Sequence, residues 1–226
     1  MEIGTIHKTC NQPKPLANIF MRTTSEIIQL KINLMDFKPA IWRRILVPAN
    51  YSFFDLHVAI QDAFGWYDQH LHQFFTDSPY KRNSQYERIA LPLPDDEEDV
   101  VDERRVKINK YLCKPGGTMF YEYDFGDSWM HEIEVEKIIG QEPKAKYPQI
   151  LGGANACPPE DCGGIGGYEH LLEVLGNPKD KEHHDMLDWL GLENPADLKS
   201  DQFDPQSVKF RNPVKVLKEQ EKGFGI

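Results

Sequence analysis

The stretch YEYDFGDSWMH, residues 121–131, predicts the β-hairpin around which the rest of the fold is built. Apolar or aromatic side chains alternate with polar ones on both sides of Gly126-Asp127, which is the period of two half-buried strands. If these are the two turn residues, the glycine supplies the positive φ of a type II′ turn. This register sets Asp124 opposite Trp129 and Glu122 opposite His131. A three-residue loop would shift the pairing by one and separate these groups, so the register is itself a prediction.

Composition narrows the class of protein. A length of 226 residues with 40% apolar residues is typical of one globular domain with a substantial core. The formal charge of −10 disfavours nucleic acid as a partner, because proteins that bind it usually carry a basic surface, although a local basic patch would still allow that contact. The chain has no run of about eighteen apolar residues and no secretory signal, so we expect a cytoplasmic protein without a membrane partner. Its four cysteines are expected to be thiols.

The chain divides into three parts. Residues 1–24 lack periodicity and predict a poorly ordered leader, residues 25–210 predict a single domain, and residues 211–226 predict a C-terminal tail. Alternation predicts strands over residues 27–34, 41–47 and 70–75 besides the hairpin. Ser52 and Asp55 have the spacing of a capping box and predict a helix from about Phe53 to Gly65. A final helix is expected to begin after Asp204 and to be interrupted at Pro213.

Two histidines on one predicted strand are candidate metal ligands. His70 and His72 are two residues apart, so both rings project from the same face and can reach one ion through neutral ring nitrogens. The spacing alone is weak evidence. Asp124 and His131 of the hairpin would complete the ligand set if the strands bring them together.

Arg43 and Arg44 point to opposite sides of the strand predicted over residues 41–47, so at most one can lie on a buried face. They can be a solvated arginine beside one packed along its stem, or a pair that contributes to ligand binding. The acidic run of residues 95–103 holds seven carboxylates in nine residues and is typical of a solvated loop. It lacks the ligand spacing of an EF-hand.

A glycine-rich segment follows the hairpin, with six glycines between residues 152 and 167. It is not a phosphate-binding loop, because no Lys-Ser/Thr pair follows and because Glu160 and Asp161 place negative charge where a phosphate would lie. Cys157 and Cys162 are spaced too widely for a zinc knuckle and have no second pair. We interpret them as structural cysteines of a compact loop.

The segments PAIWRR, FGWYDQHLHQF, YEYDFGDSWMHEI, ACPPEDCGGIGGYEHL and FDP follow one another in this order. Together they resemble the plasmid pRiA4b Orf-three-like family over roughly residues 25–210. The resemblance implies an α+β fold of the alpha-beta roll kind, built as one domain on an antiparallel sheet with a central hairpin and packed helices. It implies no established activity. The chain has neither a resolvase serine motif nor a helix-turn-helix, so the resolvase and repressor labels of some relatives are not transferred. The motif positions that the resemblance covers are Trp42, Arg43, Arg44, His70, His72, Asp124, Gly126, Asp127, Trp129, His131, Cys157, Pro158, Pro159, Glu160 and Asp161.

Two functions are compatible with these motifs. The first is a non-catalytic binding or interaction module with a protein partner, in which Asp124 and Asp127 accept hydrogen bonds from turn amides and Asp161 caps the glycine loop. Its candidate binding residues are Arg43, Arg44, Trp129, Asp127 and Glu160. The alternative is a metal-dependent hydrolase, with nucleic acid as one substrate class. In that case the cofactor is a divalent ion, and its ligands are His70, His72, Asp124 and His131. Water is activated by Glu122 or Asp161.

His131 separates these interpretations. Two carboxylates beside it, Glu122 and Asp124, would favour the charged imidazolium and raise its pKa above the ordinary value of about 6.5. A bound metal ion would instead require the neutral ring. Of the two, we predict the ion pair.

Overall fold

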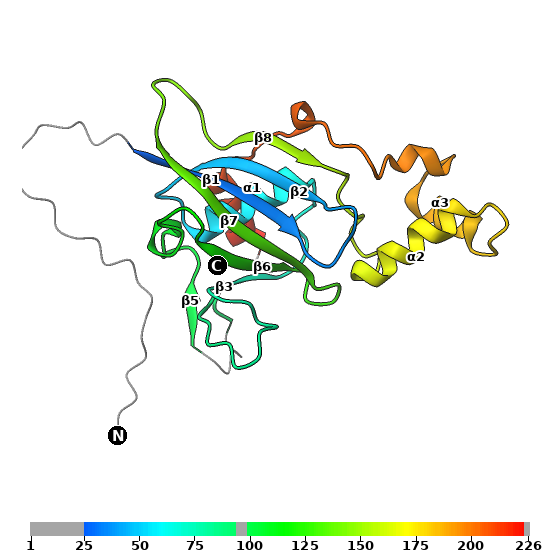
Figure 1. The fold of residues 1–226 in the computed structure, drawn as a ribbon, viewed down its shortest axis with the longest axis horizontal. Coiled ribbons are helices and arrows are strands. Elements are labelled where there is room, and N and C mark those ends of the chain that lie inside the picture. Colours follow the sequence, from blue (N-terminus) through cyan, green and yellow to red (C-terminus); the bar gives the residue numbers. More distant parts are fainter. Residues whose placement is uncertain (1–24, 94–98, 224–226) are drawn as a thin grey trace, which may run out of the picture.

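The computed structural model of the protein describes residues 25–93 and 99–223, so the predicted leader and part of the acidic run lie outside the described residues. Its centre is one eight-stranded sheet in the order β5-β4-β3-β6-β7-β1-β2-β8. Neighbouring strands are antiparallel except for the pair formed by β4 and β5. The hairpin of β6 and β7 lies in the middle of this order. Helix α1 lies against the sheet, whereas α2 and α3 lie together beyond one end of it (Figure 1). The predicted α+β class is confirmed.

The strands predicted by alternation are present, and three further strands were not predicted. The acidic run was wrongly expected to be a solvated loop throughout, since its residues 100–102 form a strand and Glu103 is only 1% exposed. The strands are β1 (Glu26–Leu34), β2 (Trp42–Pro48), β3 (His72–Phe75), β4 (Arg88–Ala90), β5 (Val100–Asp102), β6 (Thr118–Tyr123), β7 (Trp129–Gly140) and β8 (Gln149–Ala154). One boundary matters for the site, because β3 begins at His72 and leaves His70 in the preceding loop.

The helices are α1 (Phe53–Phe64), α2 (Gly164–Gly176), α3 (His183–Leu190) and α4 (Pro213–Gly223). The predicted capping box is present at the start of α1: the Ser52 side chain accepts from the Asp55 amide, and the Asp55 side chain accepts from the Ser52 amide. Gly65 ends the helix with φ 89°. The prediction for the last helix was wrong. Only a 3₁₀ turn follows Asp204, and Pro213 begins α4 because a proline fits the first helical turn.

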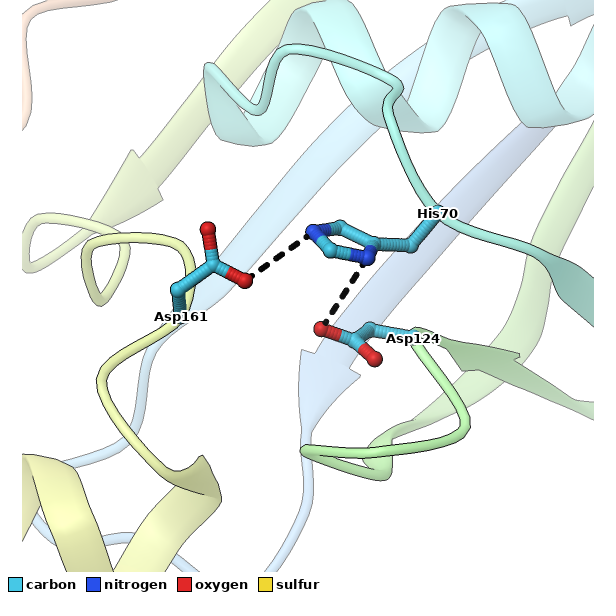
Figure 2. A group of neighbouring side chains, drawn as sticks. All are labelled: His70, Asp124 and Asp161. Carbon is cyan, nitrogen blue, oxygen red and sulfur yellow. Dashed lines mark ion pairs between the residues drawn. The ribbon is translucent and has the colours of Figure 1, made fainter.

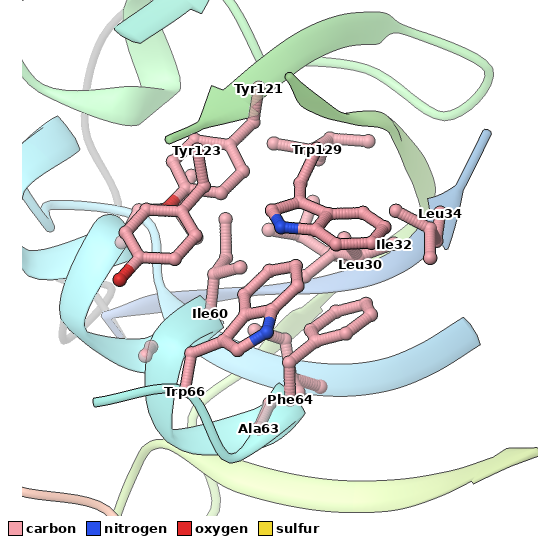
Figure 3. Packing of buried hydrophobic residues seen from close by; sticks show 14 of the residues in the cluster. Leu30, Ile32, Leu34, Ile60, Ala63, Phe64, Trp66, Tyr121, Tyr123 and Trp129 are labelled. Carbon is pink, nitrogen blue, oxygen red and sulfur yellow. The ribbon is translucent and has the colours of Figure 1, made fainter. Parts of the chain in front are cut away.

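The core lies between α1 and the sheet. The predicted burial is confirmed, since Ile28, Ile32, Ala59 and Ile133 are at most 2% exposed. In the middle of this layer the indole rings of Trp66 and Trp129 lie 6.0 Å apart, with aromatic side chains of β6 beside them (Figure 3). On the outer side of α1, a smaller cluster of Phe54, Val58 and Val216 joins α1 to α4.

The hairpin register differs from the prediction by one residue. Tyr121 lies opposite His131 and Tyr123 lies opposite Trp129. The connection is a five-residue loop in which Asp124 and Ser128 adopt positive φ values of 58° and 52° and the Ser128 amide donates to the Asp124 carbonyl. The two-residue turn was therefore wrong. The loop displaces Glu122 from His131, so the register does not provide the ion pair.

Candidate functional site

Three ligand-type side chains from distant parts of the chain meet beside the hairpin loop. His70 Nδ1 lies 3.6 Å from Asp124 Oδ2, and His70 Nε2 lies 3.2 Å from Asp161 Oδ1. The imidazole lies between the two carboxylates (Figure 2). One ligand atom from each residue lies within 4.8 Å of the others, which is close enough for all three to contact one metal ion.

The hairpin loop orients Asp124. Its Oδ1 atom accepts hydrogen bonds from the amides of Gly126 and Asp127, at 2.9 and 3.3 Å. These local bonds hold one oxygen, while Oδ2 is the atom that approaches His70. The loop of His70 is tied to the same strand end, because the Asp124 amide donates to the Leu71 carbonyl at 2.9 Å.

The glycine-rich segment brings Asp161 to the hairpin. Asp127 Oδ2 accepts from the Gly163 amide at 3.2 Å, so this aspartate links two loops instead of accepting a turn amide as predicted. Gly164 has φ 67°, and a Cβ atom there would overlap the Asp127 carbonyl. A glycine is required at this position because the two backbones approach closely. The glycines thus allow this loop to pack closely against the hairpin.

The cluster is buried on one side and open on the other. Asp124 has a side chain only 10% exposed, His70 is 28% exposed and Asp161 is 68% exposed. The Nε2 atom of His70 is itself buried and has no hydrogen-bond partner among the described residues, although Asp161 is close. Asp124 and Asp161 both have positive φ, at 58° and 59°. Aspartate adopts this left-handed conformation more readily than most residues, and both positions lie in loops.

His72, a predicted metal ligand, is not part of the cluster. Its Nε2 atom lies 2.7 Å from Glu103 Oε2 in the interior. Because β3 starts at His72, the backbone at His70 does not continue the pleat, and the two rings do not converge as the spacing suggested.

His131 is also separate from the cluster, and both interpretations offered for it need correction. It is fully buried beside Phe64 and Trp66, at ring-centroid distances of 4.8 and 5.2 Å. Neither ring nitrogen has a hydrogen-bond partner among the described residues. Burial lowers the pKa of His131 to about 3, so the ring is neutral and forms no ion pair.

The other predicted residues have internal partners. The Glu122 carboxylate accepts from the Gln73 amide group and the Ser128 hydroxyl, and it does not belong to the cluster. Trp129 is completely buried in the core. Arg43 is buried and donates to backbone carbonyls, whereas Arg44 forms a bidentate ion pair with Glu136. The prediction that only one arginine faces the interior is confirmed.

Sequence reasoning missed a buried network around His57. Its Nε2 atom lies 2.7 Å from Asp68 Oδ1, and its Nδ1 atom lies 2.9 Å from the Tyr121 hydroxyl. Gln61 donates to that hydroxyl oxygen, so the hydroxyl hydrogen points to His57 and the ring carries its proton on Nε2. Burial lowers the pKa of His57 to about 4. A polar residue on the apolar face of α1 was the available signal, since buried polar groups require partners.

The His57 network is not arranged for catalysis. The order carboxylate, imidazole, hydroxyl is that of a nucleophilic relay, but Tyr121 is completely buried, so its hydroxyl has no access to a substrate. The rings of His57 and His72 stack at 3.4 Å, which joins α1 to β3. The network therefore supports the loop of His70 through Asp68.

Cys157 and Cys162 are free thiols, as expected for the glycine loop. Burial raises the pKa of the Cys157 thiol well above its ordinary value and that of Cys162 to about 12, so both are protonated and unreactive. Cys113 is disulfide-bonded, and the expectation of four thiols was wrong for this residue. Among the described helices, none is long and apolar enough to cross a bilayer.

Comparisons with known proteins place the chain in a family. The chain is 33% identical over 173 residues to the uncharacterised protein y4hQ of Sinorhizobium fredii, a match that covers 74% of this chain and 82% of the relative. Its structure is similar to the crystal structure of a protein of unknown function from Methanosarcina mazei Go1, with a TM-score of 0.70 and 38% identity. That match covers 83% of this chain and all of the other. The profile of a family described as plasmid pRiA4b ORF-3-like protein matches residues 26–212. With the motif segments, the hairpin and the glycine loop all inside that range, the chain belongs to the plasmid pRiA4b ORF-3-like protein family.

Proposed function

We propose that this protein is a non-catalytic binding module that takes up one divalent metal ion between His70, Asp124 and Asp161. The observation that carries the proposal is the convergence of three ligand-type atoms from three loops within 4.8 Å. The buried Nε2 atom of His70 supports it, because this atom forms no hydrogen bond among the described residues although Asp161 Oδ1 lies 3.2 Å away, and an ion between them would satisfy the ring.

The donor set favours particular ions. One imidazole and two carboxylates suit zinc, a borderline ion that takes nitrogen and oxygen ligands, and also manganese, a harder ion that favours carboxylates. Calcium and magnesium prefer sites built from oxygen atoms alone. An ion at this position would cross-link the loop after α1, the hairpin loop and the glycine loop, and would thereby order one face of the molecule.

The hydrolase alternative keeps the ion and adds a reaction. Three protein ligands leave coordination positions open, which a substrate and a water molecule can fill. Of the two predicted bases, Asp161 is a proposed ligand and the Glu122 carboxylate is bonded to Gln73 and Ser128. These engagements favour the binding module over the hydrolase.

Isothermal titration with zinc and manganese, combined with elemental analysis after dialysis, tests the proposal. We expect one ion per chain, and at least about tenfold weaker binding in His70→Asn, Asp124→Asn and Asp161→Asn, since each removes one ligand. The matched control is His170→Gln, which removes an exposed histidine whose Nε2 atom lies 3.1 Å from one carboxylate, Glu182. Equal binding by the wild type and all three ligand variants would refute the site.

A hydrolysis assay tests the alternative that the protein is a metal-dependent hydrolase. The manganese-loaded protein is incubated with bis(p-nitrophenyl) phosphate and with a chromogenic peptide amide. We expect no turnover above that of the Asp161→Asn variant. Turnover that is abolished by this substitution would establish the hydrolase in place of the binding module.

A further inference from the structure

We propose that the face around His70, Asp124 and Asp161 docks a basic and apolar peptide segment of a partner protein. The inference names the partner class of the proposed binding module and rests on that function for the ion at its centre. Three features of the described residues support it: an open side, an excess of negative charge and a rim of exposed apolar side chains.

The open side is that of Asp161. Asp124 is the most buried residue of the cluster and Asp161 is the most exposed, so a ligand would approach the cluster from the side of Asp161. Coordination positions that the three side chains leave free would be accessible from this side. A partner group can therefore complete the coordination of the ion without any movement of the buried residues.

The charge of this face selects the partner. Glu160 directly precedes Asp161, and Asp127 belongs to the hairpin loop of Asp124, so four carboxylates belong to the two loops that would hold the ion together with His70. In the part of the chain that the structure describes, no lysine or arginine forms an ion pair with any of the four. A divalent ion cancels two of these charges, and about two negative charges remain with a neutral histidine. Cationic groups are attracted to this face, neutral groups are tolerated, and phosphate groups are repelled.

An apolar rim flanks the same loops. Tyr67, Leu71 and Phe125 are 75%, 50% and 46% exposed, and each lies within three residues of His70 or Asp124. The backbones of Tyr67 and Leu71 are held in place: the Tyr67 amide donates to Glu160, and the Leu71 carbonyl accepts from the Asp124 amide. Large apolar side chains on a rigid backbone are typical of a binding surface, because little conformational entropy is lost on docking.

A basic and apolar segment matches all three features. Its lysine or arginine side chains would lie against Glu160 and Asp127, its apolar side chains against the rim, and a neutral backbone carbonyl would reach the ion. A single-stranded nucleic acid could also stack on Tyr67 and Phe125, but its phosphates would face the carboxylates. Such a ligand is treated as a contrary outcome of the test.

Fluorescence anisotropy with the zinc-loaded full-length protein tests the inference. The probes are three labelled, amidated heptapeptides: one alternating lysine with leucine and phenylalanine, one with glutamate in place of lysine, and one with serine in place of the apolar residues. We expect the first to bind at least about tenfold more tightly than the other two. We also expect Leu71→Ser and Phe125→Ser to weaken it several-fold and added salt to weaken it further.

The control variant is Trp189→Ser, which removes an exposed apolar side chain from α3, remote from the cluster in sequence. Equal binding of the three peptides, tighter binding of an oligothymidylate probe, or equal effects of the three serine variants would overturn the inference. The titrations are repeated in EDTA. If zinc does not bind but the peptide preference persists, the proposed ion site fails and the docking surface stands. If zinc binds and the preference is absent, the docking surface fails alone.

Discussion

Glu160 Oε1 accepts a hydrogen bond from the Tyr123 hydroxyl at 2.9 Å, and the same oxygen accepts from the Tyr67 amide at 2.7 Å. Tyr123 directly precedes Asp124, and Glu160 directly precedes Asp161. Tyr67 belongs to the loop that carries His70. A single carboxylate oxygen thus connects the three segments whose side chains form the cluster, and Glu160 has a positioning role beside the proposed ligands.

The first prediction separates this role from direct coordination. Both hydrogen bonds end on one oxygen, so Glu160→Gln retains them and should bind zinc within about twofold of the wild type. Glu160→Ala loses both, and we expect about 10- to 100-fold weaker zinc binding, as for other residues that orient metal ligands. Without metal, amide hydrogen exchange over residues 66–71 should be faster only in the alanine variant. Loss of zinc in Glu160→Gln would identify Glu160 as a ligand instead.

Substitutions of Asp124 should separate folding from binding. Asp124→Asn keeps an oxygen that can accept from the Gly126 and Asp127 amides, and asparagine tolerates positive φ. Its free energy of unfolding should lie within about 0.5 kcal/mol of the wild type without metal. Asp124→Ala removes the acceptor and should cost about 2 kcal/mol. Urea denaturation in EDTA measures both values, and equal stability of the two variants would contradict the role of the carboxylate in the loop.

The contact between the glycine loop and the hairpin predicts a contrast between neighbouring glycines. Gly164→Ala should reduce the free energy of unfolding by more than about 2 kcal/mol, because its Cβ would overlap the Asp127 carbonyl at a positive φ. Gly166 lies in α2 with open space around it, and Gly166→Ala should be neutral or stabilise by up to about 1 kcal/mol. Thermal melts of the two variants give the comparison. A tolerated alanine at residue 164 would show that the loops do not approach as closely as described.

His131 should make the protein less stable in acid. Its pKa is about 3 in the folded state, below the value of about 6.5 expected when unfolded, so the unfolded chain takes up a proton that the folded chain does not. The stability that depends on the neutral ring is complete above pH about 6.5 and is lost progressively as the pH falls towards 3. The slope is up to about 1.4 kcal/mol per pH unit. His131→Leu should remove this component, whereas His57 remains in both proteins.

The measurement is a series of urea denaturation curves from about pH 8 to pH 4. Above pH 7 the stabilities of the wild type and His131→Leu should run parallel, and below it the wild type should fall more steeply. Parallel curves throughout the range would mean that the His131 ring is not held neutral by burial.

Local patterns predicted the central strands and α1, but not β4, β5, β8 or the start of α4. The capping box at Ser52, the positive φ of Gly65 and the alternation around Ile28 and Ile32 are each decided by neighbours within a few residues, and the structure contains them. The hairpin register was predicted incorrectly. The sequence between Tyr123 and Trp129 is compatible with a two-residue turn and with a five-residue loop. The five-residue loop forms because the Asp124 side chain accepts a hydrogen bond from the Gly126 amide.

The sequence by itself determined the α+β class, the positions of the central strands and the buried faces, because side-chain periodicity and capping are properties of short segments. Only the tertiary structure decided which polar residues meet. His70, Asp124 and Asp161 converge because a loop, a hairpin and a close glycine contact bring distant segments together, whereas His72 and His131 enter the core. Burial then decided their chemistry, since the interior stabilises the neutral form of an imidazole that the sequence alone would place beside carboxylates.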